Sequence, residues 1–372
     1  MRSVKLLGAW ALLSAASAFT LTGDSPFILC SGGNETGAVA LAQADVLVDA
    51  YAVLGHPPVT LTALPPAGSL PPGTTLVVLG SLAACPSLAG LVPAACLAGW
   101  EAHCVVAADV AGFAAVVATG AGARGAIFAA YTFAEQVLGV NPWHRLVDDA
   151  PQWAGGSIDV NASLSIVVAP PLYTYRAVFF NDEDLLSGLR RDPMARNVFD
   201  TATYSMLFET VLRLKGNAVI VATNPFPDED CVALAARRGL VVTHQHYTTL
   251  GINTNSWPLG VENWNYRVNA GAMAMAWRAS VAAQADKEVV WTLGLRGLGD
   301  YALVCPYERA VITSQSSLLA QQHPSLEPLT PPLRTINHAG TPAQMRQTAG
   351  RKSATRWATR RRGCRPRSPA RP

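Results

Sequence analysis

The segment that decides how we interpret the fold is Thr292-Leu293-Gly294-Leu295-Arg296-Gly297-Leu298-Gly299-Asp300-Tyr301. Its apolar start continues a strand predicted over residues 289–293, and its glycine-rich end carries Arg296 and Asp300 in a loop. In a (β/α)8 barrel, functional side chains follow the carboxyl ends of the strands. Arginine pairs with carboxylates through two parallel hydrogen bonds. The segment therefore predicts a barrel strand that presents an acid, and an arginine suited to a carboxylate, in the loop at its end.

Three similar strand–helix units precede this segment. Apolar runs predict strands over residues 173–180, 217–222 and 240–242. Helices are predicted over residues 201–214, 228–238 and 270–284. Pro170-Pro171 marks a linker in front of them. Repeated units of this kind predict the first half of a (β/α)8 barrel over residues 169–305.

Residues 19–168 have a different pattern, with short apolar strands between Ala-rich helices. Strands are predicted over residues 27–29, 75–79 and 114–119, and helices over 36–54 and 124–138. This alternation predicts an N-terminal α/β layer domain, so the fold class of the whole chain is α/β.

A glycine motif, Gly120-Ala121-Gly122-Ala123-Arg124-Gly125, joins the last of these strands to the last helix. A dinucleotide-binding fingerprint should open the first βαβ unit of its domain, whereas this motif closes one. We therefore predict a tight turn whose glycines let the strand and the helix pack closely. We predict no cofactor.

The two ends of the chain differ from its body. Residues 1–18 have a basic start, an apolar run and a small-residue cleavage pattern, which predict a signal peptide and a secreted, extracellular protein. No later run of about 18 apolar residues is uninterrupted, so no membrane span is predicted. Residues 306–372 hold 12 of the 28 Lys and Arg but 2 of the 25 Asp and Glu, which leaves residues 1–305 with a net charge of −7. We expect this basic tail to be disordered or mistranslated, and the secretory signal argues against nucleic acid as a partner.

The seven cysteines fit an oxidising compartment. Cys85, Cys96 and Cys104 are close enough in sequence to supply one local disulfide, although the spacing alone leaves the pairing open. No CxxC pair occurs, so a zinc site is not expected.

Polar side chains follow all four predicted barrel strands. They are Asn181, Asp182, Glu183 and Asp184 after the first, Thr223 and Asn224 after the second, His244, Gln245 and His246 after the third, and Arg296 and Asp300 after the fourth. Each has a structural alternative: a solvated acidic turn at 182–184, a hydrogen-bonded loop or a metal pair for the histidines, and a salt bridge between Arg296 and Asp300. Their occurrence at every strand end favours a functional site. Trp257, Trp264, Trp277 and Trp291 lie in the same half-domain, mostly as expected core residues.

Several stretches together resemble glycoside hydrolase family 115, the xylan α-1,2-glucuronidases, and more closely its fungal-type members. The resemblance spans roughly residues 25–303 and is carried, in order, by residues 125–135, 139–143, 175–183, 212–217, 244–246, 250–254 with Trp257-Pro258, and 294–301. It departs from the family's usual pattern in two places. The loop at Thr223-Asn224-Pro225-Phe226 has no tryptophan, and Gln245 separates the two histidines.

The resemblance implies an N-terminal α/β domain, a catalytic (β/α)8 barrel and further C-terminal domains, so this chain is expected to be truncated. It implies release of glucuronic or 4-O-methylglucuronic acid from glucuronoxylan with inversion. Asp182 and Asp300 are then expected as catalytic acids, and Asn181, His244, His246 and Arg296 as substrate-binding residues. The alternative is a non-catalytic carbohydrate-binding remnant or an inactive fragment. The sequence leaves the oligomeric state open.

Overall fold

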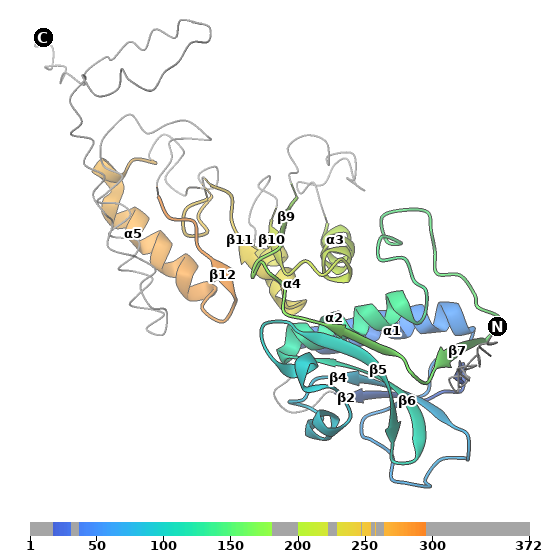
Figure 1. Ribbon diagram of the computed structural model, residues 1–372. Coiled ribbons are helices and arrows are strands. Elements are labelled where there is room, and N and C mark those ends of the chain that lie inside the picture. Colours follow the sequence, from blue (N-terminus) through green and yellow to red (C-terminus); the bar gives the residue numbers. More distant parts are fainter. Residues whose placement is uncertain are drawn as a thin grey trace, which may run out of the picture. The chain divides into compact units, whose positions relative to one another are not determined.

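A computed structural model describes residues 18–30, 37–180, 200–221, 229–246, 248–253, 257 and 264–294 (Figure 1). The N-terminal part is built on a six-stranded mixed sheet with the strand order β3-β2-β4-β6-β5-β8. Its strands are β2 (Phe27–Cys30), β3 (Thr60–Leu61), β4 (Thr75–Gly80), β5 (His103–Val110), β6 (Phe113–Gly120) and β8 (Ser165–Val168). Strands β2, β3, β4 and β6 are parallel, while β5 is antiparallel to both β6 and β8. A separate antiparallel pair joins β1 (Ala18–Thr22) to β7 (Ser157–Asn161).

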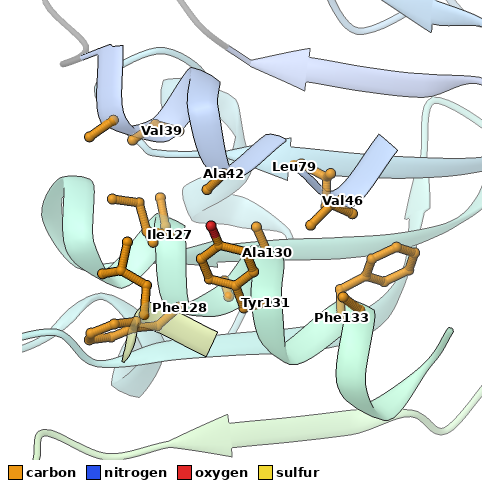
Figure 2. Close-up of a cluster of buried hydrophobic side chains, with 14 of the residues drawn as sticks. Val39, Ala42, Val46, Leu79, Ile127, Phe128, Ala130, Tyr131 and Phe133 are labelled. Atoms are coloured by element: carbon orange, nitrogen blue, oxygen red, sulfur yellow. The ribbon is translucent and has the colours of Figure 1, made fainter. Parts of the chain in front are cut away.

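The helices α1 (Gly37–Leu54) and α2 (Gly122–Gln136) pack together against one face of this sheet. Figure 2 shows how apolar side chains of the two helices meet over β4; its labelled residues include Val39, Ala42, Val46, Leu79, Ile127, Ala130 and Tyr131. A second apolar cluster covers the opposite face, where the short 3₁₀ helices Pro86–Gly90 and Ala94–Leu97 lie. The predicted strands at 27–29, 75–79 and 114–119 and both predicted helices are confirmed, which gives the α/β class.

Helix α1 is the one helix in the described part of the chain that is long and apolar enough to span a membrane by those two criteria alone. Half of the helix is buried inside the protein, and core helices pass the same criteria. Its carboxylates Asp45 and Asp49 form ion pairs with Arg238 and Arg213. These contacts are those of a core helix. The helix ends where Gly55 adopts a left-handed conformation with φ of 78°, as is common directly after a helix.

The glycine motif forms the tight turn that the sequence predicts. A Cβ atom on Gly125 would lie 2.8 Å from the carbonyl oxygen of Ala102 and 2.9 Å from the carbonyl carbon of Gly120. The backbone N–H of Ala121 donates to that same Ala102 oxygen over 2.7 Å. Two backbone segments therefore occupy the space that any side chain at position 125 needs.

Replacing Gly125 with alanine is expected to lower the free energy of unfolding by about 1–3 kcal/mol, because backbone has to move to accept the methyl group. Gly271 in helix α5 (Tyr266–Ala283) is the matched control, since a Cβ there meets nothing within 4 Å. Gly271→Ala should be neutral or stabilising by up to about 1 kcal/mol. Urea denaturation followed by circular dichroism compares the two variants, and equal effects at both positions would contradict the packing argument.

Two disulfides lie in the N-terminal part, Cys30–Cys85 and Cys96–Cys104. The second is the local bridge that the cysteine spacing allows. The first follows from sheet pairing, because Cys30 is in register with Gly80 at the end of β4 and Cys85 comes five residues later. Their Cα–Cα distances of 5.7 and 5.4 Å are normal for disulfides.

Residues 177–290 contain a second sheet, which is entirely parallel and has the order β9-β10-β11-β12. Its strands are β9 (Ala177–Phe179), β10 (Ala218–Ile220), β11 (Val241–Thr243) and β12 (Val289–Val290). Helices α3 (Thr201–Arg213), α4 (Glu229–Arg237) and α5 lie between successive strands. Neighbouring strands follow chain order, as the first units of a (β/α)8 barrel must. That the sheet belongs to such a barrel, and that the domain boundary lies at 168/169, remain predictions.

Strand β9 is shorter than the predicted strand at 173–180. Arg176 is engaged outside the sheet ladder: its backbone N–H donates to Asn217 Oδ1 over 2.8 Å, and its Nη1 donates to the carbonyl of Tyr173 over 3.0 Å. These bonds hold residues 173–176 as an irregular segment in front of the strand. Helix α5 starts earlier than predicted, because Asn265 caps it by accepting from the N–H of Arg267, and it kinks at Asn269.

Buried polar contacts join elements of the two sheets. The carboxylate of Glu101, which precedes β5, accepts hydrogen bonds from Arg124 Nε at 2.7 Å, Asn217 Nδ2 at 2.8 Å and Arg176 Nη2 at 2.5 Å. Glu101 is buried and has φ of 58°, a conformation uncommon outside glycine. Each oxygen of this carboxylate is thus held by cationic or amide donors. Glu101 thereby ties α2 to the residues that precede β9 and β10.

Candidate active site

The carboxyl ends of β11 and β12 define the part of the candidate site that the structure describes. Thr243 pairs with Val290 in the parallel register, so the residues that follow the two strands lie side by side. The imidazole of His244 stacks on the indole of Trp291, with ring centroids 6.0 Å apart and planes inclined by 20°. The Thr292 hydroxyl donates to the backbone carbonyl of His244 over 3.1 Å. The residues that follow the third and fourth strands of the parallel sheet therefore lie side by side.

His244 is buried, and its burial lowers the pKa of the imidazole from 6.5 to about 4. Desolvation disfavours the charged form and is the cause of this shift. The ring is therefore neutral at pH 5–7, with one nitrogen that donates and one that accepts. Such a group suits a hydroxyl ligand and carries no positive charge.

Buried polar atoms without a hydrogen-bond partner in the described chain concentrate near this site. Six of the seven belong to residues 244–284: His244 Nδ1, Gln245 Nε2, Thr248 Oγ1, Trp257 Nε1, Trp277 Nε1 and Gln284 Oε1. A buried polar atom left unpaired costs about 1–3 kcal/mol. Each must therefore find its partner in water, in substrate or in the rest of the chain. Gln245 is among the polar residues that the sequence places after the third strand, whereas Thr248 was missed.

The loops after β11 and β12 are joined by backbone and hydroxyl bonds. The N–H of Leu250 donates to the carbonyl of Thr292 over 3.1 Å, and the Thr249 hydroxyl donates to the carbonyl of Gly294 over 2.6 Å. Gly251 has φ of 76°, and a Cβ there would lie 2.6 Å from Ser280 Oγ and 3.6 Å from His244 Nε2. The loop thus packs closely over His244 and holds the start of the segment that leads to Arg296.

Three of the four tryptophans belong to the core, as expected. Trp257, Trp264 and Trp277 are buried, and their rings meet edge to face at centroid distances of 5.1 and 6.5 Å. Trp291 is half-buried and stacks on His244. The three buried tryptophans form a core cluster against which Trp291 packs, and Trp291 directly follows β12.

The other predicted site residues have different outcomes. His246 is exposed, in contrast to His244. No group of three His, Cys, Asp or Glu side chains suited to a metal ion occurs in the part of the chain that the structure describes. Asn181, Asp182, Thr223, Asn224, Arg296 and Asp300 lie outside the described residues. Their roles as catalytic acids and substrate contacts remain predictions.

Residues 169–336 match the sequence profile of Glycosyl hydrolase family 115. This segment contains the parallel sheet and all the predicted site residues. A search of curated proteins finds no match. The match covers less than half of the chain and supports a relationship of residues 169–336 to this glycoside hydrolase family.

One solved structure is similar to this chain in fold. The chain is similar to a family 115 4-O-methyl-alpha-glucuronidase with specificity for decorated arabinogalactans, with a TM-score of 0.68 and 21% identity over 82% of this chain and 41% of that one. The chain thus spans about two fifths of that enzyme. A beta-hexosaminidase of Streptomyces plicatus matches with 13% identity over 62% of this chain and 42% of that one, at a TM-score of 0.36. A family 20 beta-N-acetylglucosaminidase matches with 15% identity over 78% of this chain and 60% of that one, at a TM-score of 0.38. Both match too weakly to bear on the fold.

Proposed function

We propose that the protein is a secreted glycoside hydrolase that removes glucuronic or 4-O-methylglucuronic acid side chains from xylan by hydrolysis of α-1,2 bonds. The observation that carries the proposal is the family 115 match over residues 169–336, the segment in which polar residues follow each strand of the parallel sheet. Its substrate is a polysaccharide or oligosaccharide; no nucleic acid, membrane or cofactor takes part.

The described geometry supports a division of labour within the site. His244 is neutral, so it binds a sugar hydroxyl, and the uronate carboxylate requires a separate cation. Arg296 is two residues beyond Gly294, whose carbonyl is held by Thr249, and it is assigned as the carboxylate clamp. Asp182 and Asp300 are assigned as the acids that activate water and protonate the leaving oxygen, with Asn181 and His246 as further substrate contacts.

Secretion is supported by the pattern at residues 1–18 and by the two disulfides, because such bonds persist in oxidising compartments.

Two polysaccharides are candidate substrates. Xylan follows from the sequence resemblance, whereas decorated arabinogalactan is the specificity of the similar structure. Both carry the uronic acid that the proposed clamp binds.

Arg296→Ala is expected to lower kcat/KM for uronic acid release from glucuronoxylan by about 100-fold, because a charge-assisted contact to the substrate is lost. Asp300→Ala is expected to lower it at least as much. Arg278→Ala is the matched control, since Arg278 is an exposed arginine on α5. Release is measured by quantifying free uronic acid, with glucuronoxylan and arabinogalactan as parallel substrates.

Calorimetry with a glucuronic-acid-bearing xylo-oligosaccharide distinguishes the enzyme from the alternative. Binding that depends on Arg296 without any release would favour a non-catalytic carbohydrate-binding remnant. Neither binding nor release in the intact chain, or equal release by all three variants, would contradict the proposed function.

A further inference from the structure

A hollow lies in the N-terminal part, at the carboxyl end of α1. It has a volume of about 560 Å³ and is lined by Tyr51, Ala52, Leu54, Gly55, His56, Trp153, Gly155 and Gly156. None of these residues belongs to the strand ends of the parallel sheet. The hollow is therefore distinct from the candidate active site.

Two large aromatic side chains border this hollow and remain open to solvent. Trp153 is 69% exposed and Tyr51 is 53% exposed. Exposed aromatic rings that gather in one concave place mark binding sites more often than isolated ones do. An aromatic face offers an apolar surface to the C–H groups of a pyranose ring, while polar groups at its edge remain free to bond hydroxyls.

The exposed indole is held in place by its surroundings. A Cβ on Gly55 would lie 2.9 Å from Nε1 of Trp153, so the indole edge rests on a glycine that has no side chain. The next residue, Ala154, donates its backbone N–H to the carbonyl of Val53 over 2.8 Å. His56 packs in a similar way on Gly23, where a Cβ would lie 2.7 Å from the Cβ of His56. A ligand would therefore meet a largely pre-formed surface.

The charge of the lining selects the class of ligand. The described residues that line the hollow include no Lys, Arg, Asp or Glu. The end of α1 contributes a partial negative charge, because the macrodipole of a helix is negative at its carboxyl terminus. Both features disfavour a uronate, a phosphate or a nucleic acid. The last turn also contributes Ala52 and Leu54, and carbonyls at this position lack intrahelical donors and can accept from hydroxyl groups.

We infer that this hollow is a secondary binding site for the neutral pyranose backbone of a polysaccharide, with Trp153 as the stacking surface and Tyr51 and His56 as polar contacts. The inference rests on the proposed carbohydrate-active function. It deepens that function by separating two tasks: the strand ends bind the acidic side chain, and the hollow binds unsubstituted backbone sugars and keeps the polymer near the enzyme.

The test uses linear xylohexaose, a neutral probe, in isothermal titration calorimetry with the intact chain. Trp153→Ala and Tyr51→Ala are each expected to weaken binding about tenfold, because stacking area on the probe is lost. The matched control is Trp143→Ala, which removes another exposed indole, 48% accessible, that is not part of this hollow. Circular dichroism confirms that all variants are folded.

Arg296→Ala separates this site from the candidate active site, because it should leave xylohexaose binding unchanged. No binding of xylohexaose, or equal binding by Trp153→Ala and Trp143→Ala, would overturn the inference. A change in sedimentation of Trp153→Ala with intact sugar binding would assign the hollow to self-association and overturn it too. If xylohexaose binding fails while uronic acid is released, only this inference fails; if release fails while Trp153-dependent binding persists, only the hydrolase proposal fails.

Discussion

Replacing Arg213 with methionine is expected to lower the free energy of unfolding by about 3–5 kcal/mol, the largest effect of any single substitution considered for this protein. Arg213 ends α3, and its side chain is 3% exposed. Its Nη1 donates to Asp49 of α1 over 2.8 Å, and its Nε donates to Glu209 over 2.9 Å. The guanidinium also lies over the ring of Tyr131 of α2, 4.9 Å from its centre. One side chain therefore connects three helices.

The loss of stability arises because the substitution removes the partner of a buried carboxylate, Asp49. Burial raises the pKa of Asp49, and Arg213 is the strongest influence that opposes this rise. Without Arg213, Asp49 retains only the ion pair with His144 at 3.9 Å among those found in the described structure. Glu209 keeps Arg145 at 3.5 Å and Arg238 at 3.8 Å. The carboxylate of Asp49 is thus the group that becomes buried without adequate compensation.

Two variants test this explanation by urea denaturation. Adding Asp49→Asn to Arg213→Met should recover part of the lost stability, because the uncompensated charge is removed. Arg145→Met is the control: Arg145 pairs with the same Glu209 but is 46% exposed, so its loss should cost about 1 kcal/mol or less. Equal losses for Arg145→Met and Arg213→Met would contradict the argument.

The sequence predicts local elements well because their signals are local. The strands at 27–29 and 114–119 are apolar runs, and the helix over 36–54 has an Ala-rich pattern that ends at Gly55. The glycine motif at 120–125 could be assigned to a tight turn from its position at the end of a domain. The antiparallel strand β5 (His103–Val110) was missed, although it contains three valines; its place in the sheet comes from pairing with β6.

A single sequence does not indicate which residues far apart along the chain contact each other. Asp49 and Arg213 are 164 residues apart, and nothing near either residue indicates the other. Cys30 could be matched to Cys85 only once β2 was known to lie beside β4. At the candidate site, the position of His244 directly after a predicted strand indicated a functional role. Its burial could not be predicted, because burial depends on packing between segments that are distant in sequence.

The second large effect is an acid-dependent loss of stability caused by His244. Its pKa is about 4 in the folded protein and about 6.5 when the ring is solvated. Between these values the unfolded chain binds a proton at this position and the folded chain does not. Stability therefore falls as pH decreases from about 6.5 to about 4 and is unaffected by this group at lower pH. The separation corresponds to roughly 3 kcal/mol.

His244→Gln removes the titrating group but keeps a polar side chain, so the difference in unfolding free energy between this variant and the unmodified chain isolates its contribution. That difference should shift by roughly 3 kcal/mol in favour of the variant between pH 7 and pH 4. His103, which is buried and also has a lowered pKa, is present in both proteins and cancels. Parallel stability curves would show that His244 is not held neutral by burial. The contact that it makes with substrate would then include a positive charge, and the clamp assigned to Arg296 would be shared.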